Sequence, residues 1–309
     1  MRLGGDRRKG DSTMIRVTLF RATQVEIDGR LLPSEALRGR PRQVLEILAL
    51  AAGATVAKDR LADLLWEGAP PASHHATLES YICVLRRCLG VRSGPASVLA
   101  TSPGGYQLKA GEVWIDLVEF HRLVRAARTA TASEAVELST QALDLATGEL
   151  LGSEPYAGWA ERAREVFEHD AVTAYVHAAG LANGTRRFGD ATTLAQAALG
   201  HDRLAEGAWQ HLIRAHWLSG HRGEALRAYA GLRATMLEEL GDEPGRDSQD
   251  LYHAILQEPS GAEDRHGPGE LRTLLRLLRQ TLEATPGAQV PALDAGLSAA
   301  AMRVLAMQT

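Results

Sequence analysis

The sequence predicts a mainly α-helical fold with a small β component near its N-terminus. Alternating apolar residues in IRVTLFRATQVEIDG, which starts at Ile15, are typical of antiparallel strands with a turn at Asp28-Gly29. Three helical segments and a second pair of short strands follow, and from Asp116 to Gln257 the apolar spacing predicts six or seven helices. A chain of 309 residues with 45% hydrophobic residues suffices for about two packed domains.

The first two helices of the N-terminal part are short and amphipathic. The segment RGRPRQVLEILALAAG has Pro41 near its first helical position, where a missing N–H is tolerated. A second helix is predicted from about Lys58 to Trp66. We expect the first helix to bury some combination of Val44, Leu45, Leu48 and Leu50, and the second to turn Leu61, Leu64, Leu65 and Trp66 inward.

The third helix, predicted within residues 72–90, is the most informative segment. Ser73 is a candidate N-cap after Pro70-Pro71, and Gly90 is a candidate terminating residue, so the helix has about four turns. That length is enough to cross the major groove of DNA. Its buried stripe is predicted to be Leu78, Ile82, Leu85 and Leu89. The opposite face then carries His75, Thr77, Ser80, Tyr81, Val84 and Arg87, with Glu79 and Arg86 at the margins.

A hairpin is predicted directly after this helix. Its strands are Val98 to Thr101 and Tyr106 to Leu108, joined by SPGG. The order of strands, three helices and hairpin is that of a winged helix-turn-helix, in which the hairpin is the wing. We expect Thr101 and Ser102 to face a groove, the glycines including Gly105 to allow positive φ and close approach to the DNA backbone, and Tyr106 to anchor the hairpin. A plain surface hairpin is the alternative.

Basic residues on neighbouring elements complete the predicted DNA-binding surface. We expect Arg86 and Arg87 to contact phosphates, although cations at a helix C-terminus also favour the helix dipole. The complete predicted set is Arg42, Lys58, Arg60, His75, Thr77, Ser80, Tyr81, Val84, Arg86, Arg87, Thr101, Ser102, Gly105 and Tyr106.

Charge is divided unevenly along the chain. Residues 1–110 hold 16 Lys or Arg against 10 Asp or Glu, which gives +6, and the remaining residues hold 18 against 28, which gives −10. A basic N-terminal domain joined to an acidic one is typical of a nucleic-acid binder with a protein-contacting half, although chance also produces such asymmetry.

Several short motifs resemble those of one known family. They are PRQVL from Pro41, RLADLLW from Arg60, LRR from Leu85 and PGGY from Pro103. With the helical region that follows, they are similar to the OmpR/PhoB-type DNA-binding domain and the bacterial transcriptional activation domain of the SARP family (Streptomyces antibiotic regulatory proteins). The resemblance covers roughly residues 15–258.

The resemblance implies a transcriptional activator that binds tandem direct repeats in double-stranded promoter DNA as a side-by-side homodimer. It implies RNA polymerase as the second partner, through sigma factor region 4, the alpha C-terminal domain and the beta flap, usually at an antibiotic or other secondary-metabolite gene cluster. This chain has Val84 and Ser102 where many relatives have Arg, and Glu79 where Gln is usual. The operator sequence of relatives therefore does not transfer.

The second half of the chain shows a tetratricopeptide-like pattern. Ala191 lies 34 residues before Ala225, which equals the tetratricopeptide period. A long helix is predicted from about Trp159 to Asn183, and most of the alanine and aromatic stripes are interpreted as core. A helix pair is predicted from the spacing of Trp209, Leu212, Gly220, Ala225 and Tyr229.

Other classes of function lack a sequence signal. There is no P-loop, dinucleotide fingerprint or catalytic acid–base pattern, so we expect neither enzyme activity nor a cofactor. Cys83 and Cys88 lie five apart on one helix and do not pair. His74-His75 is interpreted as a surface pair rather than a metal site, because no His/Cys group has zinc spacing. No apolar run approaches the ~20 residues of a membrane span, so we expect a cytoplasmic protein.

Four segments are predicted from these patterns. They are a disordered extension (1–14), the winged helix-turn-helix (15–110), the tetratricopeptide-like activation domain (111–258), and a linker with a helical tail (259–309). The alternative function is a tetratricopeptide-type adaptor whose winged part contacts protein rather than DNA. The clustered basic residues argue against it, because protein contact alone does not require them.

Overall fold

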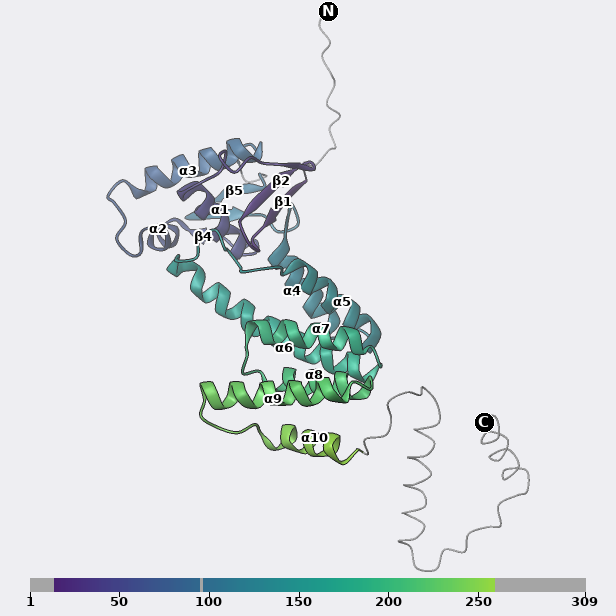
Figure 1. The fold of residues 1–309 in the computed structure, drawn as a ribbon. Helices are drawn as coiled ribbons and strands as arrows, with labels where there is room; N and C mark the ends of the chain where they lie inside the picture. Colours follow the sequence, from purple (N-terminus) through teal and green to yellow (C-terminus); the bar gives the residue numbers. More distant parts are fainter. Residues whose placement is uncertain (1–13, 95–96, 259–309) are drawn as a thin grey trace, which may run out of the picture. The chain divides into compact units, whose positions relative to one another are not determined.

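A computed structural model describes residues 14–94 and 97–258 of the chain (Figure 1). The predicted extension up to Thr13 and the predicted tail 259–309 lie outside the described residues. We call residues 14–115 the winged region and residues 116–258 the helical region. The winged region contains β1 (Ile15–Thr18), β2 (Gln24–Ile27), β3 (Arg30–Leu31), α1 (Arg40–Leu50), β4 (Val56–Ala57), α2 (Lys58–Trp66), α3 (His74–Leu89), β5 (Leu99–Ser102), β6 (Gly105–Leu108) and β7 (Val113–Ile115).

Two small sheets frame the three helices of the winged region. One has the order β3-β2-β1-β7, and the other has the order β4-β6-β5. The predicted turn at Asp28-Gly29 is confirmed, because both residues adopt positive φ (51° and 78°) and β2 pairs antiparallel with β3. Strand β7 was not predicted. It pairs in parallel with β1, with Ile15 opposite Val113, and so extends the N-terminal sheet beyond residue 110.

The three helices agree closely with the sequence prediction. Helix α2 has the predicted bounds, and the predicted stripe of α3 is buried. Helix α1 buries Val44, Leu45 and Leu48, whereas Leu50 is only half-buried. Gly90 ends α3 in the left-handed conformation, with φ 67°. The Ser73 hydroxyl makes no capping hydrogen bond, because φ −90° and ψ 14° are not the extended conformation of an N-cap.

The helical region consists of seven helices within the described residues, the upper end of the predicted count. The long helix expected from Trp159 to Asn183 is α6. Ala191 and Ala225 are both fully buried, and the Trp209 ring packs on Gly231, where an added Cβ would lie 3.1 Å from the indole. The helices are α4 (Asp116–Ala127), α5 (Ala132–Leu145), α6 (Gly158–Gly184), α7 (Phe188–His201), α8 (Glu206–Leu218), α9 (Arg222–Glu239) and α10 (Arg246–Gln257).

A continuous apolar core joins the winged region to the helical region. Phe20, which follows β1, has its ring centroid 6.4 Å from Phe120 in α4 and 5.0 Å from Phe167 in α6. The buried carboxylate of Asp116 accepts hydrogen bonds from the amides of Leu19 and Phe20 at 2.8 to 3.1 Å. The end of β1 is therefore fixed against the first helix of the helical region by both packing and polar contacts. None of the described helices has an apolar stretch long enough to span a membrane.

Candidate nucleic-acid interface

Helix α3 presents a polar face to solvent at the edge of the winged region (Figure 1). His75, Ser80 and Arg87 are exposed on it, and Thr77, Tyr81 and Val84 are half-buried. The hydroxyls of Thr77 and Ser80 donate to the carbonyl oxygens of Ser73 and Ala76, each at 3.1 Å. Because a hydroxyl oxygen keeps its lone pairs when it donates, both remain able to accept a hydrogen bond from a base edge.

Two exposed positions on this face were missed by sequence reasoning. Ala76 and Cys83 are exposed and lie one turn from Ser80 and Arg87 respectively. The same helical periodicity that fixes the buried stripe could have found them. A small residue such as Ala76 permits close approach of another surface, and an apolar methyl suits contact with a thymine methyl.

Arg86 ties the wing to α3. Its guanidinium donates to the carbonyl oxygen of Leu99 (3.3 Å from Nε and 3.0 Å from Nη2) and to Oγ1 of Thr101 (2.7 Å). Leu99 and Thr101 both belong to β5. Arg87, in contrast, is exposed, and its guanidinium has no hydrogen bond or ion pair among the described residues. These adjacent arginines were predicted to play the same part, yet only Arg87 has an unengaged guanidinium.

The wing is a tight hairpin held against β4. Pro103 and Gly104 form its turn, and Gly104 has φ 86°, as the third residue of a type II turn requires. A Cβ on Gly105 would lie 2.3 Å from the carbonyl oxygen of Val56, so the glycine permits the close pairing of β6 with β4. Tyr106 is only 2% exposed, which agrees with an anchoring role. Thr101, Pro103 and Gly104 are exposed on the hairpin and Ser102 is half-buried, so this end of the wing is accessible to a ligand.

Lys58 and Glu79 form an ion pair between the start of α2 and the margin of α3. The Lys58 Nζ lies 2.9 Å from the Glu79 carboxylate and 5.6 Å from the centroid of the Tyr106 ring. The hydrogen bond to Glu79 raises the pKa of Lys58. The negative charge of Glu79 is thus paired within the protein, which lowers its repulsion toward phosphate.

Aromatic packing supports α3 from the side of α2. The Tyr81 ring stacks on Trp66 with the centroids 6.4 Å apart and the planes 22° from parallel. Trp66 is the last residue of α2. Tyr81 is therefore partly committed to holding two helices together, and only its exposed edge can meet a ligand.

Arg42 has a different environment from the rest of the predicted set. It lies on α1, where its Nε is 3.4 Å from the buried Glu46, and its Nη2 donates to Glu154 of the helical region. Gln43 also donates to Glu154, at 2.8 Å. Arg60 is exposed on α2 and has no partner among the described residues. Arg42 therefore lies at the contact between the two regions, whereas the guanidinium of Arg60 is accessible to a ligand.

Comparison with known proteins agrees with both parts of the chain. The sequence model of "Transcriptional regulatory protein, C terminal" matches residues 34–108, and that of "Bacterial transcriptional activator domain" matches residues 115–256. Regulatory protein DnrI of Streptomyces peucetius is 35% identical over 241 residues, which cover 74% of this chain and 88% of DnrI. Transcriptional regulatory protein MoaR1 of Mycobacterium tuberculosis is 30% identical over 230 residues, which cover 71% of this chain and 73% of MoaR1.

A solved structure has the same architecture. Mycobacterium tuberculosis EmbR, in complex with a low affinity phosphopeptide, aligns with a TM-score of 0.67 and 26% sequence identity over 88% of this chain and 71% of EmbR. The predicted fold class, a winged helix-turn-helix followed by an all-α domain, is thus confirmed. The two domain matches and the identity to DnrI show that this chain belongs to the SARP family of DNA-binding transcriptional activators.

Proposed function

We propose that this protein binds tandem direct repeats in promoter DNA through α3 and the wing, and recruits RNA polymerase to a secondary-metabolite gene cluster. The observation that carries the proposal is the exposed polar face of α3, with a wing fastened beside it by the three hydrogen bonds of Arg86. A helix and a hairpin held in one rigid arrangement can occupy a major groove and the adjacent minor groove together.

Each part of this surface has a distinct role in the proposal. Thr77, Ser80 and Val84 meet base edges, because they lie on the exposed or half-exposed side of α3. Arg87 and Arg60 contact phosphates, since both guanidinium groups are unengaged among the described residues. Thr101 and Ser102 approach the minor groove from the wing. We leave Arg42 out of the DNA surface, because the carboxylates of Glu46 and Glu154 already pair with it.

The helical region is proposed to meet the transcription machinery rather than DNA. Residues 111–258 hold 13 Arg against 23 Asp or Glu, so this part repels phosphate and attracts basic protein surfaces. Sigma factor region 4, the alpha C-terminal domain and the beta flap of RNA polymerase are the proposed partners. The exposed loop between α2 and α3, which begins at Glu67, is the proposed sigma contact. Two protomers lie side by side on the repeats.

A pair of full-length variants tests whether DNA binding and activation are separate. Glu67 adopts φ 52°, and Asn tolerates this left-handed conformation, so Glu67→Asn changes the loop charge without straining the backbone. We expect this variant to keep the wild-type footprint and to lose run-off transcription with purified polymerase. Arg87→Ala, which removes one phosphate contact, is expected to weaken both the footprint and transcription. Full transcription by Glu67→Asn would contradict the sigma contact. No footprint by the wild-type protein would favour the adaptor alternative.

A further inference from the structure

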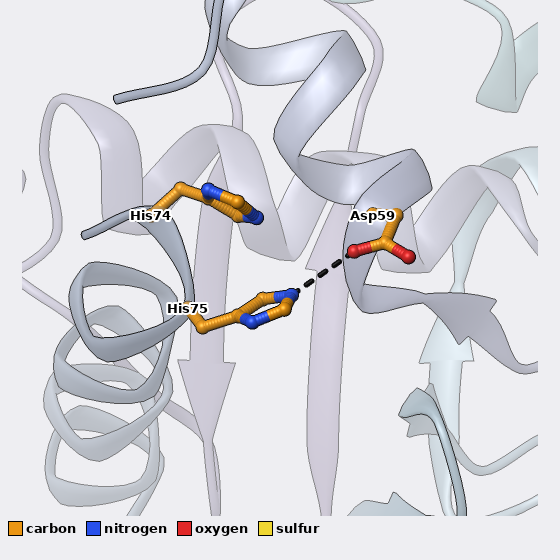
Figure 2. Close-up of side chains that lie close together, drawn as sticks. All are labelled: Asp59, His74 and His75. Atoms are coloured by element: carbon orange, nitrogen blue, oxygen red, sulfur yellow. Dashed lines mark hydrogen bonds and ion pairs between the residues drawn. The ribbon is translucent and has the colours of Figure 1, made fainter. Parts of the chain in front are cut away.

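Three metal-ligating side chains converge where α2 meets the start of α3. Asp59 lies in the first turn of α2, and His74 and His75 are the first two residues of α3. One ligand atom from each residue lies within 4.8 Å of the other two. Figure 2 shows both imidazole rings directed toward the Asp59 carboxylate. We propose that Asp59, His74 and His75 bind a divalent transition-metal ion, with Zn²⁺ as the best-fitting species.

The hydrogen bond of His74 prepares its ring for coordination. Its Nδ1 lies 2.8 Å from the carbonyl oxygen of Pro71. A carbonyl oxygen only accepts, so Nδ1 carries the hydrogen and donates it, and Nε2 keeps a free lone pair. Ligating histidines in proteins commonly have their second ring nitrogen fixed by a backbone carbonyl or carboxylate in this way. The ring is therefore oriented for a metal by a contact that a plain surface histidine does not need.

His75 and Asp59 supply the remaining two ligand atoms. The Nε2 of His75 lies 3.0 Å from Oδ1 of Asp59, and the two imidazole centroids are 4.3 Å apart. Zinc bonds to imidazole nitrogen and carboxylate oxygen at about 2.0 to 2.2 Å. Small rotations of exposed side chains suffice to place an ion between the three atoms, because His75 and Asp59 are 56% and 84% exposed.

The donor set decides the class of metal. Two imidazole nitrogens and one carboxylate suit Zn²⁺ and its transition-metal neighbours, whereas Mg²⁺ and Ca²⁺ prefer oxygen ligands alone. Three protein ligands leave one position for water. The positive end of the α3 dipole opposes a cation there, and the Asp59 carboxylate offsets it. We therefore expect weaker binding than at a closed four-ligand zinc site.

The ion would join α2 directly to the start of α3. The covalent connection between these helices is the exposed loop from Glu67 to Ser73. A bound metal would add a direct link between the two helices through one coordination centre, and it would fix the first turn of α3. Metal binding itself does not depend on the proposed DNA binding, so the titration is made without DNA.

The test is a Zn²⁺ titration of the metal-free full chain in competition with a chromophoric chelator. We expect one ion to bind, and we expect Asp59→Asn to weaken its affinity at least about tenfold, because an amide keeps the hydrogen bond to His75 but ligates zinc poorly. The double variant His74→Ala with His75→Ala should lose the ion, and Co²⁺ bound to the wild type should show a low-coordinate visible spectrum.

Two control variants assign the ion to this cluster. His169→Ala, which removes an exposed histidine on α6, and Cys83→Ser with Cys88→Ser should bind Zn²⁺ as the wild type does. Circular dichroism confirms that each variant is folded. The proposal is overturned if the wild type binds no zinc, if the double histidine variant keeps it, or if Asp59→Asn binds with unchanged affinity.

Discussion

Two arginines of the winged region, Arg42 on α1 and Arg87 on α3, have opposite environments. Arg42 on α1 is held by Glu46 and Glu154 at the contact with the helical region, whereas Arg87 on α3 is exposed and unpaired among the described residues. Both arginines belong to the DNA-binding set predicted from the sequence. An arginine is available to phosphate only if the fold places no carboxylate beside it. Its positive charge alone does not decide this.

The contact between the winged region and the helical region depends on buried polar groups as well as on apolar packing. Glu46 is fully buried, and burial raises the pKa of its carboxyl against the lowering by Thr23, Arg42 and Ser153. Burial also raises the pKa of Asp116, against the lowering by the amides of Phe20, Leu19 and Leu117. Among the described residues, α3 has no buried charged side chain, so variants at this contact and variants on α3 should separate stability from DNA binding.

The largest effect is expected from Asp116→Ala, at the contact between α4 and the end of β1. The change leaves the buried amides of Leu19, Phe20 and Leu117 without their acceptor, which should lower the free energy of unfolding by about 3 kcal/mol. Asp247→Ala is the matched control, because Asp247 is also a first-turn acid but is exposed, and its loss should cost at most about 1 kcal/mol. Urea denaturation measures both, and equal losses would contradict the account.

A smaller loss, about 2 kcal/mol at pH 7, is expected from Arg42→Ala, because Glu46 stays buried without its cation. The raised pKa of Glu46 means that its contribution to stability is greatest below its ordinary value of 4.5 and is lost as the pH rises through the folded value. The stability that Arg42→Ala loses relative to the wild type should therefore become smaller as the pH falls toward 4.5. At pH 7, the double variant Arg42→Ala with Glu46→Gln should lose less stability than Arg42→Ala alone. A deficit that is constant with pH would show that Glu46 is not involved.

Arg86→Ala should cost about 1 kcal/mol, because its hydrogen bonds to β5 are half-exposed. Its diagnostic effect is local. The amides of β5 should exchange their hydrogens faster when Arg86 no longer holds the wing, whereas Arg87→Ala should leave that exchange unchanged. If the β5 amides exchanged their hydrogens equally slowly in both variants, the distinction between the two adjacent arginines would be wrong.

Local patterns predicted the helices well but not the contacts between distant segments. The bounds of α2 and the buried stripe of α3 follow from helical periodicity within a few turns. Strand β7 is three residues long and pairs with β1 almost 100 positions earlier, so no local alternation identifies it. Glu154, the partner of Arg42, is 112 residues away in the sequence.

The same limit applies to the candidate metal site. His74-His75 is conspicuous in the sequence, but Asp59 belongs to another helix, and His75 and Asp59 are 16 positions apart with no motif between them. Their proximity depends on how α2 packs on α3. A spacing search for zinc ligands therefore could not propose the cluster, whereas the packed helices do.

The most direct measurement of the central claim compares Arg87→Ala with Arg42→Ala in DNA binding. The probe is a duplex selected by the wild-type protein from a random-sequence pool, and fluorescence anisotropy gives the affinity over a range of salt concentrations. We predict that Arg87→Ala weakens binding and lowers the slope of log K against log salt by about one, since one phosphate contact is lost. Folded Arg42→Ala should keep the wild-type slope. An unchanged slope for Arg87→Ala, or a reduced slope for Arg42→Ala alone, would contradict the assignment of the exposed face of α3 to DNA.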